Sequence, residues 1–236
     1  MATNGLFTTK GEKIEIRGVK KSYMTGNSRV MALKGVDLDL EPGESVAIVG
    51  VSGCGKTTLL NLLGGVDVPD EGAIRVGNRD IAKLSERELE RYRLHRAGFV
   101  FQFFNLIPSL TALENLELNM TLAGKPKQER VDRAVELLKI VGMEDHATKK
   151  PDQLSGGEQQ RIAIAAALAN DPLVILGDEP TGNLDTKNAE AITNLLVSLA
   201  ADYGKTVFLA THDSRVAARV HSTHTMVDGR LDWAGE

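Results

Sequence analysis

The chain has 236 residues and a formal net charge of −4 at pH 7, and 42% of its residues are hydrophobic and 25% are charged. These values are ordinary for a globular protein of one large domain or two closely joined subdomains, and the charge argues against a nucleic-acid partner. No apolar run reaches the roughly 18 residues that a membrane-spanning helix needs.

The N-terminus and the cysteine content indicate where the chain works. The stretch MATNGLFTTKGEKIEIRG lacks the apolar centre of a secretory signal peptide. The single cysteine, Cys54, excludes an internal disulfide and fits a reducing compartment. We therefore expect a cytoplasmic protein that inserts nothing into a membrane and acts on any membrane through a partner.

The first predicted elements are strands. Apolar and polar residues alternate in KIEIRGV (13–19) and in LKGVDLDL (33–40), which is typical of antiparallel strands. The turn EPGE then precedes the apolar run SVAIVG (45–50), which indicates a buried strand. The antiparallel strands should thus lead into a strand of a second, buried sheet.

The segment GVSGCGKTT (50–58) matches the phosphate-loop pattern G-x-x-x-x-G-K-[ST], between that strand and the helix-like run LLNLLGG. Glycines let successive N–H groups turn toward a phosphate, and the following helix adds a partial positive charge at its start. We assign Lys56 to the β- and γ-phosphates of ATP and the Thr57 hydroxyl to Mg²⁺. The ATP-binding candidates of this loop are Gly50, Val51, Ser52, Gly53, Cys54, Gly55, Lys56, Thr57 and Thr58. A plain strand-to-helix turn is the alternative, but it leaves the lysine and the hydroxyls unexplained.

Cys54 lies inside this loop beside Lys56, where a cation and a helix start favour a thiolate. Two roles are open for it. It is a small filler whose backbone N–H binds phosphate, which we favour, or it is a redox sensor.

A hairpin and two helices are predicted for the middle of the chain. GAIRVGNRDI (72–81) alternates like a hairpin around Gly77 and Asn78. Ser85 and Glu88 have the spacing of a capping box, which predicts a helix that starts at Ser85. A further helix is predicted over 130–141. Its apolar face comprises Val131, Ala134, Val135, Leu138 and Val141.

The last third of the chain alternates between helix and strand. EQQRIAIAAALAN (158–170) and NAEAITNLLVSLAADYG (188–204) are predicted helices, and LVILGD (173–178) and TVFLAT (206–211) are predicted strands. Short apolar runs between helices predict parallel strands that are covered on both faces. The fold class is therefore α/β, with ligands bound at the carboxyl ends of a parallel sheet.

Polar residues follow two of these strands. Asp178 and Glu179 are adjacent carboxylates, which repel each other and are costly to desolvate unless a cation or a proton transfer uses them. We assign Asp178 to Mg²⁺ and Glu179 to the attacking water, while an acidic cap on the next helix is the alternative. His212 follows the strand TVFLAT, and we expect it to sense the γ-phosphate rather than serve only structure.

The segment LSGGEQQR (154–161) opens the alanine-rich helix. Ser155 and Glu158 have capping-box spacing, and local structure needs nothing more. A glycine-rich helix start is also an anion site, yet the chain already has one phosphate site. This conflict is resolved if Ser155 serves the ATP that a second copy of the chain holds.

With these motifs the chain resembles the ABC-type ATPases over nearly its whole length. The resemblance implies that Tyr23 stacks on adenine, that Gln102 senses metal and water, and that two copies pair head to tail around two ATP molecules. The implied catalytic residues are Glu179, His212 and Gln102, and the implied metal ligands are Thr57, Gln102 and Asp178. The implied signature, which acts on the other subunit's ATP, is Leu154, Ser155, Gly156, Gly157 and Glu158, and the implied dimer-interface loop is Asn183, Leu184 and Asp185.

The resemblance also implies the domain plan of a single ABC ATPase domain over 1–236. A phosphate-loop core with a parallel sheet, together with an antiparallel β subdomain, would occupy about 12–101 and 160–236. A helical subdomain that carries the signature would occupy about 102–159.

Within the family, FVFQFFNLIPSLTALENLEL and PTGNLD are similar to the ATPase subunits of lipoprotein-releasing, macrolide-exporting and cell-division permeases. The implied partner is an integral membrane permease, with this chain peripheral on the cytoplasmic face of the membrane. Three positions depart from the family pattern: Ala166 replaces an arginine, Gly177 replaces an apolar residue, and Val51 stands where proline is common. None removes a ligand of phosphate, metal or water, so they bear on helix contacts and on dimer closure.

The segment FFNLIPSL (103–110), directly after Gln102, is our candidate output surface. It carries large apolar side chains around Asn105 and Pro108, which discourage a regular helix, and such side chains often mark a docking site. We expect Phe104, Leu106 or Ile107 to contact a short cytoplasmic helix of the permease.

Three other functions are weighed against this one. The ATPase of an ABC importer shares parts of both subgroup segments. A soluble ABC ATPase that acts on DNA or ribosomes usually has long coiled coils or two cassettes in one chain, and this sequence has neither. A module that senses ATP without turnover is disfavoured by Glu179 and His212.

Overall fold

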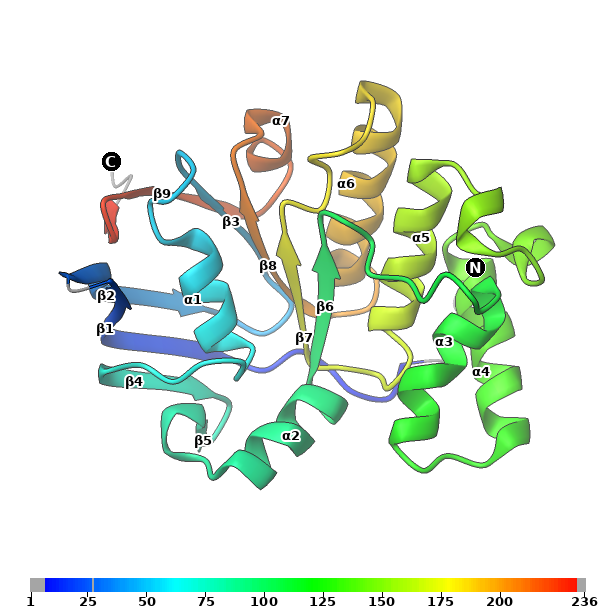
Figure 1. The fold of residues 1–236 in the computed structure, drawn as a ribbon, viewed down its shortest axis with the longest axis horizontal. Coiled ribbons are helices and arrows are strands. Elements are labelled where there is room, and N and C mark those ends of the chain that lie inside the picture. The colour runs from blue at the N-terminus through cyan, green and yellow to red at the C-terminus, as the bar shows by residue number, and fades with distance from the viewer. Residues whose placement is uncertain (1–6, 27, 233–236) are drawn as a thin grey trace.

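The computed structural model describes residues 7–26 and 28–232, which form two sheets with helices packed on them (Figure 1). The strands are β1 (Ile14–Thr25), β2 (Ser28–Leu40), β3 (Ser45–Val49), β4 (Glu71–Val76), β5 (Arg79–Asp80), β6 (Ala97–Phe101), β7 (Val174–Asp178), β8 (Thr206–Thr211), β9 (Ser222–Val227) and β10 (Arg230–Asp232). The α-helices are α1 (Lys56–Leu63), α2 (Glu86–His95), α3 (Ala112–Leu122), α4 (Lys127–Ile140), α5 (Gly156–Ala167), α6 (Thr186–Ala201) and α7 (Ser214–Ala217). Short 3₁₀ turns are η1 (Ile81–Lys83), η2 (Glu144–His146) and η3 (Pro151–Gln153). Residues 1–6, the first part of the stretch interpreted as lacking a signal peptide, lie outside the described residues.

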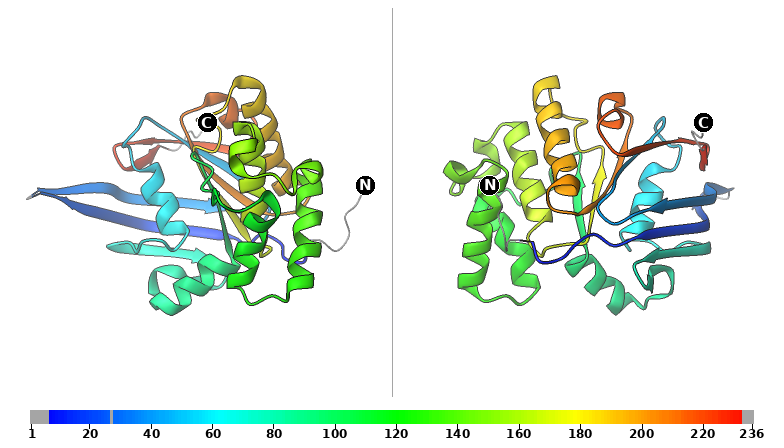
Figure 2. Two further views of the ribbon diagram at one scale, coloured as in Figure 1. Left: turned by 45° about the vertical axis from the view of Figure 1, so that its right-hand side comes forward. Right: turned by 180° about the vertical axis from the view of Figure 1, so that it is seen from behind.

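The first sheet is antiparallel, in the order β2-β1-β4-β5. The two alternating segments pair as predicted, with Ile14 opposite Leu40, because alternation places their apolar residues on one buried face. Both strands extend beyond those segments, to Thr25 in β1 and from Ser28 in β2. The result is a long hairpin that extends away from the body of the molecule (Figure 2).

The predicted turn and the first predicted capping box are confirmed. Val76 pairs with Arg79 across the two-residue turn of the β4–β5 hairpin. Helix α2 follows Ser85, whose N–H and hydroxyl both donate to the Glu88 carboxylate, at 2.9 and 2.6 Å.

The second sheet has the order β10-β9-β3-β8-β7-β6, and all its strands are parallel except β10, which is antiparallel to β9. The three predicted buried strands are β3, β7 and β8. Strands β6 and β9 were not predicted, because AGFVF is short and contains glycine and STHTMV is mostly polar. A Cβ atom at Gly177 in β7 would lie 2.7 Å from the Leu209 side chain, so the missing side chain makes room for Leu209.

Helix α1 is enclosed between the two sheets, which explains why its sequence is so apolar. Its leucines Leu59, Leu60, Leu62 and Leu63 are all buried. They share one apolar cluster with residues of β1, β2 and β4 on one side and of β3, β7 and β8 on the other. Their burial contributes roughly 6 to 12 kcal/mol before the entropy cost of folding. The phosphate loop is therefore attached to a helix that is fixed in the core.

Helices α3, α4, α5 and α6 share a second apolar cluster with the other face of the parallel sheet (Figure 1). The predicted face of α4 is wrong in one position, because Val135 is 38% exposed while Leu137 is buried. The buried residues Ala134, Leu137, Leu138 and Val141 follow i, i+3, i+4, i+7 spacing, and Val135 lies off that stripe. In the described part of the chain, no helix combines the length and the apolar character that crossing a membrane requires.

Candidate active site

The loop between β3 and α1 owes its shape to glycine. Gly53 and Gly55 have left-handed backbone angles, with φ of 80° and 115°, which glycine adopts without strain. A Cβ atom at Gly50 would lie 2.4 Å from the carbonyl oxygen of Met226 in the neighbouring strand. The three glycines are therefore needed for the turn itself, and they bring the chain to the start of α1.

Lys56, the first residue of α1, is only 6% exposed. Its Nζ donates to the carbonyl oxygens of Gly50 at 2.7 Å and Val51 at 3.1 Å. It also lies 3.8 Å from Oε1 of Glu179. A buried ammonium group needs such partners because burial without them is costly. Lys56 thus brings a positive charge to the inside of the loop.

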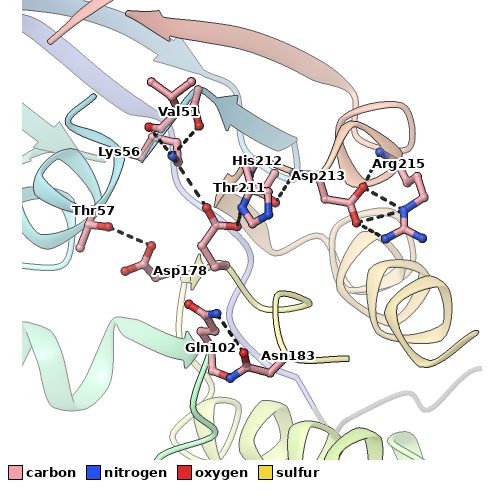
Figure 3. A network of polar contacts seen from close by, with 12 residues as sticks. Val51, Lys56, Thr57, Gln102, Asp178, Asn183, Thr211, His212, Asp213 and Arg215 are labelled. Atoms are coloured by element: carbon pink, nitrogen blue, oxygen red, sulfur yellow. Dashed lines mark hydrogen bonds and ion pairs between the residues drawn. The ribbon is translucent and has the colours of Figure 1, made fainter. Parts of the chain in front are cut away.

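Thr57 and Asp178 connect α1 with the end of β7. The Thr57 hydroxyl donates to Oδ1 of Asp178 at 3.1 Å (Figure 3). Burial raises the pKa of Asp178, and the adjacent charge of Glu179 adds to this effect, although the hydrogen bond from Thr57 opposes it. The Asp178 carboxylate would consequently be stabilised by a cation in the cleft.

Glu179 has a left-handed φ of 48°, which costs a residue with a side chain about 1 to 2 kcal/mol. Its Oε2 lies 2.9 Å from Nδ1 of His212 and also accepts the His212 backbone N–H at 3.2 Å. Strain of this kind is concentrated at functional sites, where the surrounding structure enforces it. Glu179 therefore stands between Lys56 and His212, with one carboxylate oxygen toward each.

Gln102 and Asn183 form a reciprocal pair, as Figure 3 shows. Nε2 of Gln102 donates to Oδ1 of Asn183, and Nδ2 of Asn183 donates to the backbone oxygen of Gln102, both at 3.0 Å. In the same loop Leu184 is partly buried, and the Asp185 side chain caps α6 by accepting the Asn188 N–H at 2.9 Å. The pair joins the end of β6 to the predicted dimer-interface loop.

One open cleft of about 690 Å³, at the carboxyl ends of the parallel strands, brings together Lys56, Thr57, Gln102, Asp178, Glu179 and His212. Its lining is Ala32, Val51, Ser52, Gly53, Gly55, Lys56, Thr57, Thr58, Gln102, Asp178, Glu179 and His212. Every lining residue except Ala32 was among the predicted site residues, and a small apolar residue carries no chemical signal in a sequence. Gly50 and Cys54 are not in this lining. Cys54 is buried with its sulfur beside Gly50, which suits a small filler better than a sensor.

Tyr23 of β1 is also absent from the cleft lining. Its hydroxyl donates to Oδ2 of Asp67 at 2.9 Å, and Nζ of Lys21 lies 5.3 Å from the centre of its ring. Burial raises the pKa of the Tyr23 hydroxyl, and Asp67 adds to it, while a hydrogen bond with Thr58 opposes it. The contact with Thr58 puts Tyr23 near the loop, and its stacking on adenine stays a prediction.

The signature segment does not reach the cleft of its own chain, since no residue of 154–158 is in the lining. Ser155 caps α5, because its Oγ accepts the Glu158 N–H at 3.4 Å, and its own N–H and hydroxyl donate to Oε2 of Glu158 at 2.7 and 2.8 Å. At Gly157 a Cβ atom would lie 2.4 Å from the side chain of Asn188, so a larger residue does not fit there. This separation is what the hypothesis of a site shared between two copies requires.

A second hollow, of about 300 Å³, lies beside the candidate output surface. Its lining includes Phe104, Leu106 and Ile107, together with residues of α2, β6, α3 and α5, among them Ala166. Phe104 and the next residue have left-handed φ of 58° and 53°, so this segment is irregular, as predicted. Ile107 is 41% exposed and Leu106 is partly buried. We call this hollow the side groove.

Comparison with known proteins adds to this geometry. The family described as ABC transporter matches residues 33–182. The lipoprotein-releasing system ATP-binding protein LolD of Bacteroides fragilis is 44% identical over 218 residues, which are 92% of this chain and 99% of that protein. An uncharacterized ABC transporter ATP-binding protein of Thermotoga maritima is 47% identical over 219 residues, 93% of each chain. The macrolide export ATP-binding/permease protein MacB of Rhodopseudomonas palustris is 46% identical over 216 residues, but the chain spans only 33% of that protein.

Two solved structures have the same fold. A dimeric structure of a post-hydrolysis state of the ATP-binding cassette MJ0796, bound to ADP and Pi, matches with a TM-score of 0.85 at 45% identity and covers 93% of this chain and 96% of its own. A dimeric structure of MJ0796, described as a bacterial ABC transporter cassette, matches with a TM-score of 0.85 at 46% identity and the same coverage. The predicted α/β fold with its antiparallel and helical parts is confirmed.

Proposed function

The chain belongs to the ABC transporter family, and from this premise we propose how its cleft hydrolyses ATP and what the reaction drives. It is an ATP-binding subunit with ATPase activity of the ABC type. The observation that carries the proposed mechanism is the meeting of Lys56, Glu179 and His212, from three strand ends, in one cleft.

Lys56 binds the β- and γ-phosphates by exchanging the carbonyl oxygens of Gly50 and Val51 for phosphate oxygens. The start of α1 and the N–H groups of the loop add to this positive field. Because α1 is enclosed between two sheets, the field is fixed before the nucleotide arrives. Preorganised charge of this kind is usually the largest contribution to catalysis.

Glu179 orients the attacking water and accepts its proton. The water oxygen forms a bond to the γ-phosphorus, the bond from that phosphorus to the bridging oxygen breaks, and ADP leaves with the electron pair. His212 holds the other carboxylate oxygen of Glu179 at 2.9 Å and so directs the first oxygen toward Lys56 and the phosphate. His212 also reaches the γ-phosphate, since its side chain is 67% exposed at the rim of the cleft.

The donor set of the cleft fits Mg²⁺. Asp178, Thr57 and Gln102 offer oxygen atoms in one lining. Such a sparse set suits an ion that keeps most of its ligands as water and phosphate oxygens. We propose that these three residues hold it. When bound, the ion neutralises charge on the phosphates.

The proposed roles are tested with Glu179→Gln, which keeps the size of the side chain but removes the base. Positioned bases contribute about 10²- to 10⁴-fold, so phosphate release should fall by that factor, equivalent to about 3 to 5 kcal/mol in the barrier. ATP binding, followed with a fluorescent analogue, should persist. The control is Glu90→Gln on the exposed side of α2, which should release phosphate like the unaltered protein. Wild-type turnover in Glu179→Gln would remove Glu179 from the mechanism.

The active unit is proposed to be a dimer of two copies. Ser155 and the helix start behind it then face the γ-phosphate that the other copy holds, which would complete a site that one chain leaves half built. The distance of the signature from its own cleft supports this arrangement, as do the dimeric structures of MJ0796. ATP favours the closed pair because it contacts both chains, and hydrolysis removes that link.

The proposed partner is an integral membrane permease of the lipoprotein-releasing or macrolide-exporting type, on whose cytoplasmic face this chain sits. The names of the similar proteins LolD and MacB support the type. The side groove supports the place, because it is concave, is lined in part by large apolar side chains, and is connected to Gln102 by the segment 103–107. We propose that Phe104, Leu106 and Ile107 there receive a short helix of the permease.

A further inference from the structure

A histidine lies beside the glutamate that forms the capping box with the signature serine. Nε2 of His146, at the end of η2, lies 3.2 Å from Oε1 of Glu158. The other oxygen, Oε2, accepts both the backbone N–H and the hydroxyl of Ser155, at 2.7 and 2.8 Å. The two carboxylate oxygens of Glu158 therefore have different partners: Oε1 faces His146, and Oε2 accepts from Ser155.

The two ring nitrogens of His146 have different surroundings. Among the described residues, Nδ1 of His146 is buried and makes no hydrogen bond. Nε2, by contrast, faces a carboxylate oxygen of Glu158, which is an acceptor for a ring N–H. Nε2 is therefore the ring nitrogen that is placed to donate to Glu158.

The hydroxyl of Ser155 has one proton, and two acceptors compete for it. It is donated to Glu158 in the capping box, whereas a phosphate is purely an acceptor and can be bound by this hydroxyl only if it donates there. If the Ser155 hydroxyl turns away from Glu158, Oε2 of Glu158 still accepts the Ser155 N–H. Oε1 of Glu158 keeps its contact with His146. Each carboxylate oxygen therefore still has a donor after the hydroxyl has turned.

We propose that His146 is a positioning residue for the signature serine: its Nε2–H holds Glu158, so that the Ser155 hydroxyl can turn to the γ-phosphate bound by a second copy of the chain. This inference rests on the proposed dimeric ATPase. In this role His146 acts through Glu158. Lys149 lies in the same loop and acts on Glu158 through its charge. Within the described part of the chain no hydrogen bond joins the two side chains, so Lys149 does not orient the carboxylate.

The test compares two replacements of His146 in steady-state phosphate release over a range of ATP concentrations. His146→Leu removes the donor, and kcat should fall about five- to tenfold, the size expected for one ordinary intramolecular hydrogen bond. KM for ATP should change less than twofold, because the phosphate loop of the same chain is untouched. His146→Gln places an N–H at a similar reach and should restore kcat to within twofold of the unaltered protein.

A double-mutant cycle separates positioning from general damage to the fold. In a Glu158→Ala background, His146→Leu should have no further effect on kcat. The matched control is His95→Leu, an exposed histidine at the end of α2, which should leave kcat unchanged. Thermal melting of each variant checks that it is folded.

Three results would overturn the proposal. They are wild-type kcat in His146→Leu, loss of kcat in His146→Gln as large as in His146→Leu, and an undiminished effect of His146→Leu on top of Glu158→Ala. Failure of the proposed function itself looks different, because the unaltered protein would then release no more phosphate than Glu179→Gln.

Discussion

Asp178 illustrates at the residue scale how a site residue lowers the stability of the fold that carries it. Burial and the neighbouring Glu179 raise its pKa, so the ionised form is disfavoured in the folded protein. We predict that Asp178→Asn, measured without nucleotide at pH 7, raises the melting temperature by about 2 to 4 °C, roughly 1 kcal/mol at a partly solvated site. The same change should reduce Mg²⁺-dependent phosphate release at least about a hundredfold, because it removes a proposed metal ligand.

The sign of the pH dependence follows from the direction of the shift. A carboxyl group whose folded-state pKa is raised costs stability above that pKa, and the cost disappears as the pH falls through it. The advantage of Asp178→Asn in melting temperature should therefore shrink as the solution is made acidic. A lower melting temperature for this variant at pH 7 would show that the Asp178 charge is already compensated in the folded chain.

The residues that hold phosphate were predictable because their chemistry is local. Lys56 follows from a loop pattern in consecutive residues, and Asp178 and Glu179 follow from two charges placed after an apolar run. The contact of His146 with Glu158 was not predictable, because it depends on how a 3₁₀ turn lies against a helix that starts ten residues later. A lone histidine carries no mark of such a partner.

At the scale of elements, the segment from Phe7 to Gly11 ties the helices to the sheet. The Phe7 ring lies 4.9 Å from the Tyr203 ring and 4.9 Å from the guanidinium of Arg133 in α4. Nζ of Lys205, a fully buried side chain, donates to the Thr9 carbonyl at 2.7 Å and to Asp171 at 2.5 Å. The segment is thus connected to α4 through Phe7, and through Thr9 to Lys205, the residue that precedes β8.

Lys205→Met tests this tie. The substitution keeps the apolar length of the side chain but leaves Asp171 without its cation, and breaking a buried pair in this way costs several kcal/mol. Because 15% of the Asp171 side chain remains exposed to solvent, we expect a loss of about 2 to 3 kcal/mol, a fall in melting temperature of roughly 4 to 12 °C. Lys139→Met on the exposed face of α4 is the control and should melt like the unaltered protein.

Acid should weaken the same tie. Burial opposes the charge of Asp171, but the hydrogen bond and charge of Lys205 and the N–H groups of Thr8 and Thr9 hold its pKa below the usual 3.8. Stability from this group is therefore present above that usual value and is lost as the pH falls through the lowered pKa. The gap in melting temperature between the unaltered protein and Asp171→Asn should close in strong acid, and a gap that persists at pH 2 would assign it to packing.

Elements with a clear period were predicted well and the others were not. The helix after Ser85 and the strands β3, β7 and β8 have strong local signals. The sequence contains no such signal for the length of the β1–β2 hairpin. Residues near its end, such as Met24 and Val30, are exposed, and this breaks the alternation of apolar and polar residues on both strands. Strand β6 is recognised as a strand only through its pairing with β7, which lies more than seventy residues further along the chain.

At the scale of the whole molecule, the side groove predicts how the subunit is coupled to its partner. Ile107→Ala removes an exposed apolar side chain from the groove, and a central contact of an interface is worth about 1 to 3 kcal/mol. We expect binding to the reconstituted permease to weaken roughly tenfold and permease-stimulated phosphate release to fall with it. Basal phosphate release without permease should stay within twofold.

The matched control is Leu122→Ala, which alters a 66%-exposed side chain on α3 that is not part of the groove lining. It should leave both activities unchanged. Equal loss of basal and stimulated activity in Ile107→Ala would count against the groove as the docking site. Unchanged stimulation would place the permease elsewhere on the surface.

The arrangement of the whole chain could be predicted only in part. Alternating helices and strands indicate a parallel sheet, but nothing in consecutive residues states that β3 lies between β8 and β9. That order brings the carboxyl ends of β3, β7 and β8 together and so gathers Lys56, Glu179 and His212. The location of the site was predicted from the general rule that ligands bind at the carboxyl ends of parallel strands, and the strand order was not needed for it.

Phe104 belongs to two places at once. It lines the side groove, and its ring tip lies 3.6 Å from where a Cβ atom of Gly156 would be, at the first turn of α5. Under the proposed function, a permease helix that pushes on this ring also pushes on the surface that meets the other copy's nucleotide. Binding of cargo to the permease would thereby control when the nucleotide of the opposite copy is hydrolysed, and the Phe104 ring would transmit the signal.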